Sequence, residues 1–439
     1  MFRKLLSTIV SLLVFSLLSY SSKGYALTIA GEAYPEILNK YLASHPEIKV
    51  TPMYDDTEFI RDALDHSDAI DVYFFHTLQS TVFETLRDKG YLLPLSDPEL
   101  MAFTQSLYPE LQTITVHAGE VCALPFAMVI QPGIGVYMDT WKKCGFSEED
   151  LPMTWGQLMH FAVEEWPAIS DQYEGVRLFD ATNTSYALLT QIGNNYEAYR
   201  ARHNYEFGYD TPEFREILQL FQQMSRDEEN NEYDDAEEFL FCCTYYPSVN
   251  EFGGNTHALQ LSFREGEGPC WATGMLVMAI NPESRCIDEA VELVKYVVKN
   301  MNIYDRMDMC PEENKPVIGD LYYEGQADYE SQMKLYSERL ETAEDEATYR
   351  EIEMERDAYD QETQAWLSEN KYAASTESIQ QYRWEVENAL TPIYRTGLSR
   401  EEYRAVNEKR QQFLDGQISA DQYISELERR FVFNALENQ

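Results

Sequence analysis

GEVCALPFAMVIQPGIGVYMDTWKKCGFSEEDLPMTW, residues 119–155, reads as two strands joined by a bend and followed by a turn and a capped helix. The first apolar run ends at Pro125, which has no N–H to donate to a sheet. A second apolar run, 128–130, is interrupted by Gln-Pro-Gly at 131–133 and continues at 134–138. Thr154 can cap the helix that opens at Trp155. The pattern predicts a crossing between two lobes, with a cleft beside it.

The residues before this crossing alternate between strand-like and helix-like runs. Short apolar runs at 27–30, 48–50 and 70–75 are separated by two helical patterns. This alternation predicts a parallel sheet with helices on both faces. Ligands of such sheets bind at the carboxyl ends of the strands. The rule selects seven candidate ligand-binding residues, each of which equally fits a loop position without ligand contact: Glu32, Tyr34, Tyr54, Asp55, Phe75, His76 and Thr77.

Five further motifs occur along the chain. They are DAIDVYFF at 68–75, LRDKGYLLPLS at 86–96, DTPEF at 210–214, GMLVMAIN at 274–281 and FLDGQISADQYISELERR at 413–430. Together with residues 119–155, they resemble, in the same order, the extracellular solute-binding proteins of bacterial ABC importers (family 1, maltose-binding-protein-like). The resemblance implies an α/β, two-lobed periplasmic-binding-protein-like (type II) fold with three interlobe crossings. It also implies capture of a small solute, most often a carbohydrate, and delivery to an ABC permease.

The same resemblance divides the chain into segments. It implies a signal peptide at 1–26, a first lobe made of 27–131 and 277–380, and a second lobe made of 132–276 and 381–439. Five aromatic residues near the expected crossings could stack on a sugar ring: Phe126, Trp155, Trp271, Tyr382 and Trp384. For Trp271, packing inside the hinge core is the alternative.

Residues 326–371 form an insertion with a heptad stripe. Apolar positions at 329, 333, 336, 340, 343 and 347 alternate in spacing between four and three, and the stripe resumes at Ile352. The spacing predicts two helices folded as a hairpin, or one bent helix. We expect this insertion to pack on the first lobe by its own stripe. The alternative is an arm that docks a partner.

The first residues resemble a secretory signal. Arg3 and Lys4 precede an apolar run, 5–18, that is shorter than the ~20 residues of a membrane-spanning helix. We therefore expect cleavage near Leu27 and an extracytoplasmic protein, with an uncleaved anchor as the alternative. Many relatives carry a lipidated cysteine after the signal, but no cysteine precedes Cys122 here. Membrane contact is then expected only through permease docking or an uncleaved signal.

Charge and composition bear on the other possible functions. A formal charge of −42 argues against nucleic-acid binding, which needs a basic surface. The seven cysteines form no CxxC pair, and the seven histidines form no HxxH or HExxH pair. No serine-hydrolase elbow or phosphate loop is present. We expect a monomer without cofactor, metal site or catalytic residues. Alternatives are a ligand-sensing receptor for a membrane signalling protein, a non-sugar solute (polyamine, peptide, metal) and, third, a glycosidase.

Overall fold

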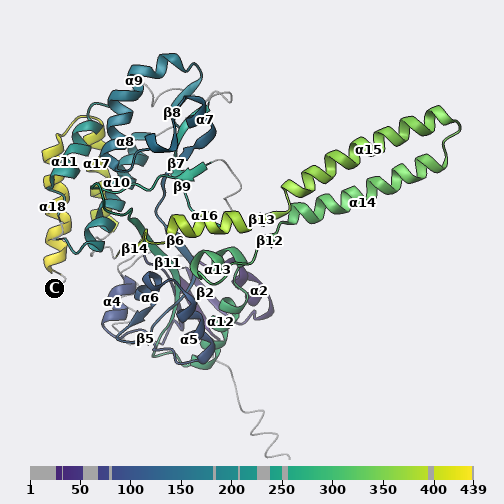
Figure 1. The fold of residues 1–439 in the computed structure, drawn as a ribbon. Helices are drawn as coiled ribbons and strands as arrows, with labels where there is room; N and C mark the ends of the chain where they lie inside the picture. The colour runs from purple at the N-terminus through teal and green to yellow at the C-terminus, as the bar shows by residue number, and fades with distance from the viewer. Residues whose placement is uncertain are drawn as a thin grey trace, which may run out of the picture.

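The structure, a computed structural model, contains two large β-sheets in its described residues, each with its own hydrophobic core, and two short two-stranded sheets (Figure 1). It describes residues 26–31, 33–52, 68–78, 82–180, 184–205, 208–224, 238–249, 256–393 and 400–437. The expected signal peptide lies outside the described residues, apart from Ala26. We call the six-stranded sheet with its helices the first lobe, and the four-stranded sheet with its helices the second lobe. Within the described part of the chain, no helix is long and apolar enough to cross a bilayer.

The first-lobe sheet has the order β14-β11-β3-β1-β2, and the sixth strand, β6, also pairs with β11. Its strands are β1 (Thr28–Gly31), β2 (Lys49–Pro52), β3 (Val72–His76), β6 (Leu124–Ile130), β11 (Trp271–Ile280) and β14 (Leu390–Pro392). Strand β1 runs parallel to β2 and β3, as the alternation predicts. The long strand β11 runs antiparallel to β3 and β6, so the sheet is mixed.

Helices cover both faces of this sheet. They are α2 (Glu36–Ser44), α4 (Val82–Asp88), α5 (Pro98–Ser106), α6 (Pro109–Thr115), α12 (Ile287–Lys299) and α13 (Ile303–Met309). Successive residues of a strand point to opposite faces. Accordingly, Phe74 packs against Tyr34 beside α2, whereas Phe75 packs against Phe83 of α4. A small hairpin, β4 (Val116–His117) and β5 (Glu120–Val121), precedes β6.

The second-lobe sheet has the order β10-β7-β9-β8. Its strands are β7 (Gly133–Tyr137), β8 (Val176–Phe179), β9 (Glu238–Tyr245) and β10 (Thr256–Ala258). Its helices are α7 (Met138–Lys143), α8 (Trp155–His160), α9 (Trp166–Ile169), α10 (Thr184–Arg202), α11 (Pro212–Phe221), α17 (Arg400–Leu414) and α18 (Ala420–Glu437). Thr154 caps α8 by accepting a hydrogen bond from Gln157 N at 3.0 Å, as its position predicts.

The chain passes between the two sheets three times. Residues 131 and 132 join β6 to β7, residues 259–270 join β10 to β11, and the chain leaves β14 for α17 and α18, whose side chains belong to the second core. The three predicted crossings are therefore present. The predicted lobe boundary at 276/277 falls inside β11, and the boundary at 380/381 falls inside α16 (Thr376–Val386). The exact lobe limits remain a proposal.

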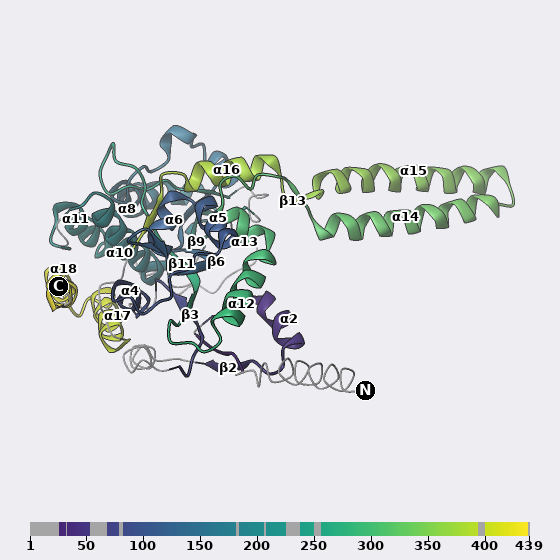
Figure 2. The same cartoon turned by 90° about the horizontal axis from the view of Figure 1, so that it is seen from below.

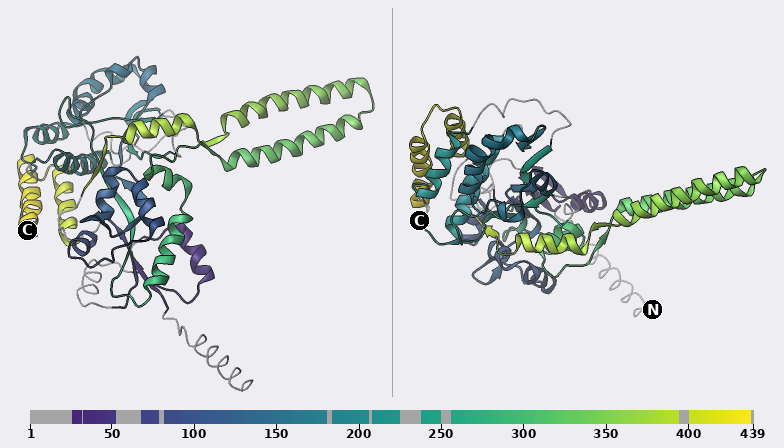
Figure 3. Two further views of the ribbon diagram at one scale, coloured as in Figure 1. Left: turned by 60° about the horizontal axis from the view of Figure 1, so that its bottom comes forward. Right: turned by 45° about the horizontal axis from the view of Figure 1, so that its top comes forward.

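The insertion forms a long helical hairpin that projects from the body. Its helices are α14 (Asp320–Glu341) and α15 (Glu346–Glu369), and the short strands β12 (Val317–Ile318) and β13 (Tyr372–Ala374) pair at its base. Figures 2 and 3 show both helices side by side and pointing away from both lobes. The hairpin prediction is confirmed, but the expected packing on the first lobe is wrong.

The apolar stripe is instead the seam between α14 and α15. A Cβ at Gly325 would stand 2.3 Å from Cζ3 of Trp366, so the bare glycine backbone makes room for the indole. Tyr329 donates a hydrogen bond to Asp360 across the seam at 2.7 Å. Each helix therefore packs its stripe against the other, with the α14 positions half-buried and Ile352 of α15 buried.

Candidate functional site

The candidate site lies at the carboxyl-terminal edge of the first-lobe sheet. Strands β1, β2 and β3 end there at Gly31, Pro52 and His76, while β6 and β11 continue past this edge toward the second lobe. A Cβ at Gly31 would stand 2.4 Å from Phe74 Cβ, so only glycine lets β1 and β3 approach so closely here. The sheet thus ends beside β6 and β11, which we call the hinge strands because they lead into the second lobe.

A cavity of about 360 Å³ opens at this edge. Tyr34 and Phe126, two of the residues predicted from sequence, contribute aromatic rings to its wall, and the Phe74 ring lies between them. The wall also includes side chains of α2, β6, β11, α12 and α13: Ile37, Lys40, Ala127, Leu276, Val297 and Asn300–Asn302. Apolar faces with a few convergent polar groups are what a small-molecule site needs.

The polar side of the cavity comes from the start of α13. Asn302 caps this helix by accepting a hydrogen bond from Tyr304 N at 2.9 Å, which fixes the chain entering it. Asp305, one turn further, also lines the cavity, and burial raises the pKa of its carboxyl. A desolvated carboxylate favours ligands that offer hydrogen-bond donors, such as hydroxyl groups.

The remaining predicted residues lie elsewhere. Phe75 is buried against α4, on the opposite face from Tyr34, and Trp155 is buried against Phe263 in the second lobe. His76 is half-buried at the end of β3, opposite Leu276. Three predicted site residues lie outside the described residues: Glu32, Tyr54 and Asp55.

Two of the hinge aromatics are core residues in this conformation. Trp271 is 3% exposed and packs beside Gly133, at the point where β6 passes into β7. Tyr382 is fully buried, and its hydroxyl donates a hydrogen bond to the backbone oxygen of Asp308 at 2.7 Å. For Trp271, this is the hinge-core packing given as the alternative to sugar stacking.

Trp384 is the exception among these aromatics. It is 62% exposed on α16, a helix that lies between the lobes in Figure 1. The next residue on each side of it is anchored: Arg383 donates hydrogen bonds to Tyr108 and to backbone oxygens of the first lobe, and Glu385 accepts hydrogen bonds from the second-lobe sheet. The helix is thus fixed while the indole stays open to solvent.

Helix α10 supports both hinge strands from the second lobe. Asn194 donates a hydrogen bond to the Gln131 side chain at 3.0 Å, and Asn195 accepts one from Ala272 N at 3.2 Å. Consecutive asparagines of one buried helix therefore hold the first two crossings next to each other.

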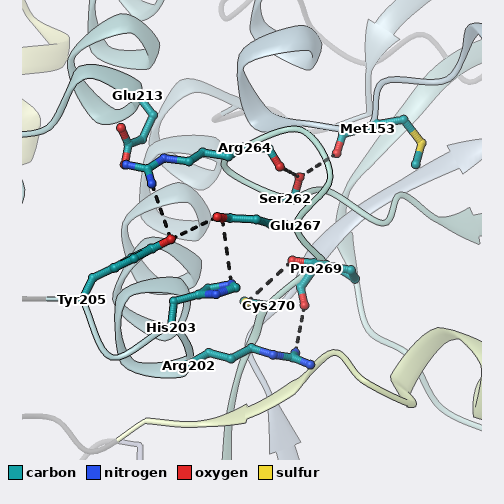
Figure 4. Close-up of polar contacts among 11 residues, drawn as sticks. Met153, Arg202, His203, Tyr205, Glu213, Ser262, Arg264, Glu267, Pro269 and Cys270 are labelled. Atoms are coloured by element: carbon teal, nitrogen blue, oxygen red, sulfur yellow. Dashed lines mark hydrogen bonds and ion pairs between the residues drawn. The ribbon is translucent and has the colours of Figure 1, made fainter.

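A polar network braces the loop that leads into β11 (Figure 4). Tyr205 donates a hydrogen bond to Glu267 at 3.0 Å, and His203 lies 3.9 Å from the other oxygen of the same carboxylate. Arg264 bridges from Glu213 to the Tyr205 hydroxyl. The network holds the end of α10 to residues 264–267. In the described ranges, no group of three or more His, Cys, Asp or Glu side chains could hold a metal ion.

Sequence reasoning did not identify Lys40, Asn300, Asn302 and Asp305 as cavity residues. They belong to helix ends that approach the sheet edge only once α2, α12 and α13 are packed. The only local signal was the Asn-Met-Asn run at 300–302, which breaks the helical pattern. That signal marks a turn and does not indicate where the turn lies.

Comparison with known proteins gave matches among solved structures only. No family model and no curated protein matches the chain. The binding protein MsmE of Bacillus subtilis, in an open conformation, is 13% identical with a TM-score of 0.55, covering 94% of this chain and 98% of its own. A Bacillus licheniformis sugar transporter solved with stachyose is 14% identical with a TM-score of 0.52, covering 93% and 100%.

Maltose-bound T. maritima MalE3 is similar to the same extent, at 13% identity and a TM-score of 0.51, covering 93% of this chain and 99% of its own. At such identities the likeness concerns the fold, because related folds carry unrelated functions. The chain has the two-lobed α/β fold of these periplasmic-binding-protein-like structures, over nearly its whole length.

Proposed function

We propose that this chain is an extracytoplasmic solute-binding protein that captures a saccharide between its lobes and delivers it to an ABC permease. The observation that carries the proposal is the cavity at the carboxyl edge of the first-lobe sheet, beside the strands that lead into the second lobe. Support also comes from the structures of the same fold, of which one was solved with stachyose and another with maltose.

The arrangement suits binding without chemical change. The half-buried ring of Tyr34 offers an apolar face for the C–H surface of a sugar, and Asp305 with Asn302 offers polar partners for its hydroxyls. Phe126, 4% exposed, fills the wall behind this surface. The ligand would first contact one lobe and then gain contacts from the other as the hinge closes. It can drive closure only by binding the closed form better than the open form. A micromolar dissociation constant requires about −8 kcal/mol after that cost.

Export, a monomeric state and docking to permease subunits are parts of the same proposal. They rest on the signal-like residues 1–26 and on the analogy of fold. We infer binding rather than turnover because the proteins of the same fold are binding proteins.

A thermal-shift screen of the mature chain tests the proposal. We expect one class of saccharide to raise the melting temperature, with maltose and stachyose as first probes, and amino acids, polyamines and metal ions to have no effect. Stabilisation only by a polyamine, peptide or metal would contradict the saccharide assignment, and release of shorter sugars would contradict the non-enzymatic one.

A further inference from the structure

A half-buried carboxylate of the first lobe binds a segment of the second. Asp308, in α13, accepts hydrogen bonds from Ser248 Oγ at 3.3 Å and from Val249 N at 3.0 Å. Residues 246–249 directly follow β9, and we call them the β9 tail. Val249 is fully buried and belongs to the core of the first lobe. The tail of a second-lobe strand is thus inserted into the first lobe, with Asp308 as its polar anchor.

A second carboxylate, Glu385 of α16, also accepts hydrogen bonds from the second lobe. Glu385 has no exposed surface and accepts hydrogen bonds from Tyr245 Oη at 2.9 Å, Ala258 N at 3.2 Å and Gln381 Nε2 at 2.8 Å. Tyr245 ends β9 and Ala258 ends β10, so both donors from outside α16 come from the second-lobe sheet.

Helix α16 is itself fixed to the first lobe. Tyr382 donates to the backbone oxygen of Asp308, so the two carboxylate clusters share one helix–helix contact. Arg383 donates to Tyr108 Oη at 2.7 Å and to Cys310 O at 2.9 Å. A rotation of the lobes that moves β9 and β10 away from α13 must therefore break the hydrogen bonds that Asp308 accepts from the β9 tail. The same rotation must separate Glu385 either from β9 and β10 or from the first lobe.

Both carboxyls lie where a charge is poorly solvated. The pKa of Asp308 is raised to about 7, mainly by burial and in part by the neighbouring Asp305, while the Val249 and Ser248 hydrogen bonds and Arg383 oppose the shift. Tyr108 of α6 and Tyr382 of α16 also face Asp308. Burial likewise raises the pKa of Glu385 to about 7, against the hydrogen bonds from Gln381, Ala258 and Tyr245.

We propose that Asp308 and Glu385 form a proton-sensitive latch that holds the two lobes in the observed orientation. The role of the latch in solute capture rests on the proposed function, because opening of the lobes is what would admit the solute. The latch itself is a property of the protein without ligand.

Protonation leaves the latch intact. A neutral Asp308 can accept from Val249 N through one oxygen and donate its O–H to Ser248 Oγ, since a hydroxyl both donates and accepts. The charged form accepts hydrogen bonds from the same two donors but loses hydration on burial. The latched state therefore binds protons more tightly than the unlatched state.

The direction of the pH effect follows from this linkage. The stabilisation of the latched state is complete below the pKa of the exposed carboxyls, near 4, and it is lost as pH rises to about 7. Each carboxyl changes the ratio of latched to unlatched molecules by up to about tenfold per pH unit in that window. Above about pH 7 the ratio of latched to unlatched molecules no longer changes with pH.

Backbone hydrogen exchange of the unliganded chain tests the latch, because the amides of Val249 and Ala258 are themselves bonded to the two carboxylates. After correction for the intrinsic pH dependence of exchange, we expect the protection of both amides to fall by about tenfold or more from about pH 5.5 to about pH 8. Asp308→Asn keeps the shape and the amide acceptor but cannot ionise, so the fall in protection of both amides should shrink. Glu385→Gln should shrink it likewise, and the double variant should make the protection of both amides independent of pH.

Asp139→Asn, at an exposed position of α7, is the matched control and should keep the wild-type fall. Protection that is flat with pH in the wild type, or a fall of wild-type size that persists in the double variant, would overturn the latch. No saccharide is needed for this experiment, so a pH-dependent latch without saccharide stabilisation would refute the proposed function alone. Saccharide stabilisation with pH-independent protection would refute the latch alone.

Discussion

Leu78 lies directly over Gly274 in the hinge. A Cβ at position 274 would stand 2.4 Å from Leu78 Cγ and 2.7 Å from Thr77 Oγ1. Leu78 follows the first-lobe strand β3 but is buried in the core of the second lobe, and Gly274 lies in the crossing strand β11. The absence of a side chain at 274 is therefore what lets the first lobe reach the second at this point.

Gly274→Ala tests this close packing. The added methyl overlaps side-chain atoms of the buried Leu78, and overpacking of this kind costs about 1–3 kcal/mol. We expect that loss in the free energy of unfolding measured with urea. Gly268→Ala is the control, because a Cβ there meets nothing within 4 Å. Equal stability of the two variants would contradict the hinge packing described above.

Trp384→Ala tests the exposed indole on α16. Because the side chain is mostly solvent-exposed, its loss should leave the melting temperature unchanged, while loss of ring stacking weakens saccharide binding by about 1 kcal/mol, roughly fivefold. Calorimetric titration with the saccharide found in the screen measures this change. Tyr323→Ala, which removes an exposed ring from α14 on the projecting hairpin, should bind as the wild type does. Unchanged affinity for Trp384→Ala would remove Trp384 from the site.

Glu84→Gln tests a buried carboxyl in α4. Burial raises the pKa of Glu84 to about 8, with Arg87 acting in the opposite direction, and Oε1 has no hydrogen-bond partner among the residues that the structure describes. A raised pKa in the folded state stabilises the fold below the unfolded value and stops doing so as pH rises to about 8. The variant should therefore gain stability relative to wild type, by about 3 kcal/mol between about pH 5 and pH 8. Urea unfolding of both proteins at both pH values checks this, and a constant difference would contradict it.

Ile352→Asp tests the seam of the hairpin. Ile352 is 6% exposed in α15, and an unpaired carboxylate there should separate α14 from α15. We expect faster proteolysis within residues 320–369 and loss of helical circular dichroism. Met354→Asp adds the same charge two residues away, where the side chain is 74% exposed, and should change neither. Proteolysis that is equally slow in both variants would show that the hairpin does not depend on this seam.

Much of the fold could be predicted from local pattern. The capped start of α8 at Thr154, the bend at Gln131-Pro132 and the alternation that leads to β3 all depend on neighbours in sequence. The packing of the hairpin could not be predicted from local pattern, because its apolar stripe would fit against the first lobe as well as against a second helix. Only the length match between α14 and α15 decides the matter.

The site was harder to predict than the fold. Tyr34 follows a parallel strand and Phe126 lies in the crossing, so simple rules found both. The same rules selected Phe75, because they fix the end of a strand but not which face each side chain takes. Trp271 and Tyr382 were selected as large aromatics near the hinge, and such rings fill cores as readily as they line sites. Asp305 joins the cavity only through the packing of α13.

Small-angle X-ray scattering of the mature chain, with and without the saccharide found in the screen, tests most directly that two lobes close on a solute. The account predicts a smaller radius of gyration with saturating saccharide, and no change with a sugar that does not stabilise the protein. Identical scattering curves in both states, at a concentration where calorimetry shows full occupancy, would contradict hinge closure as the mode of binding.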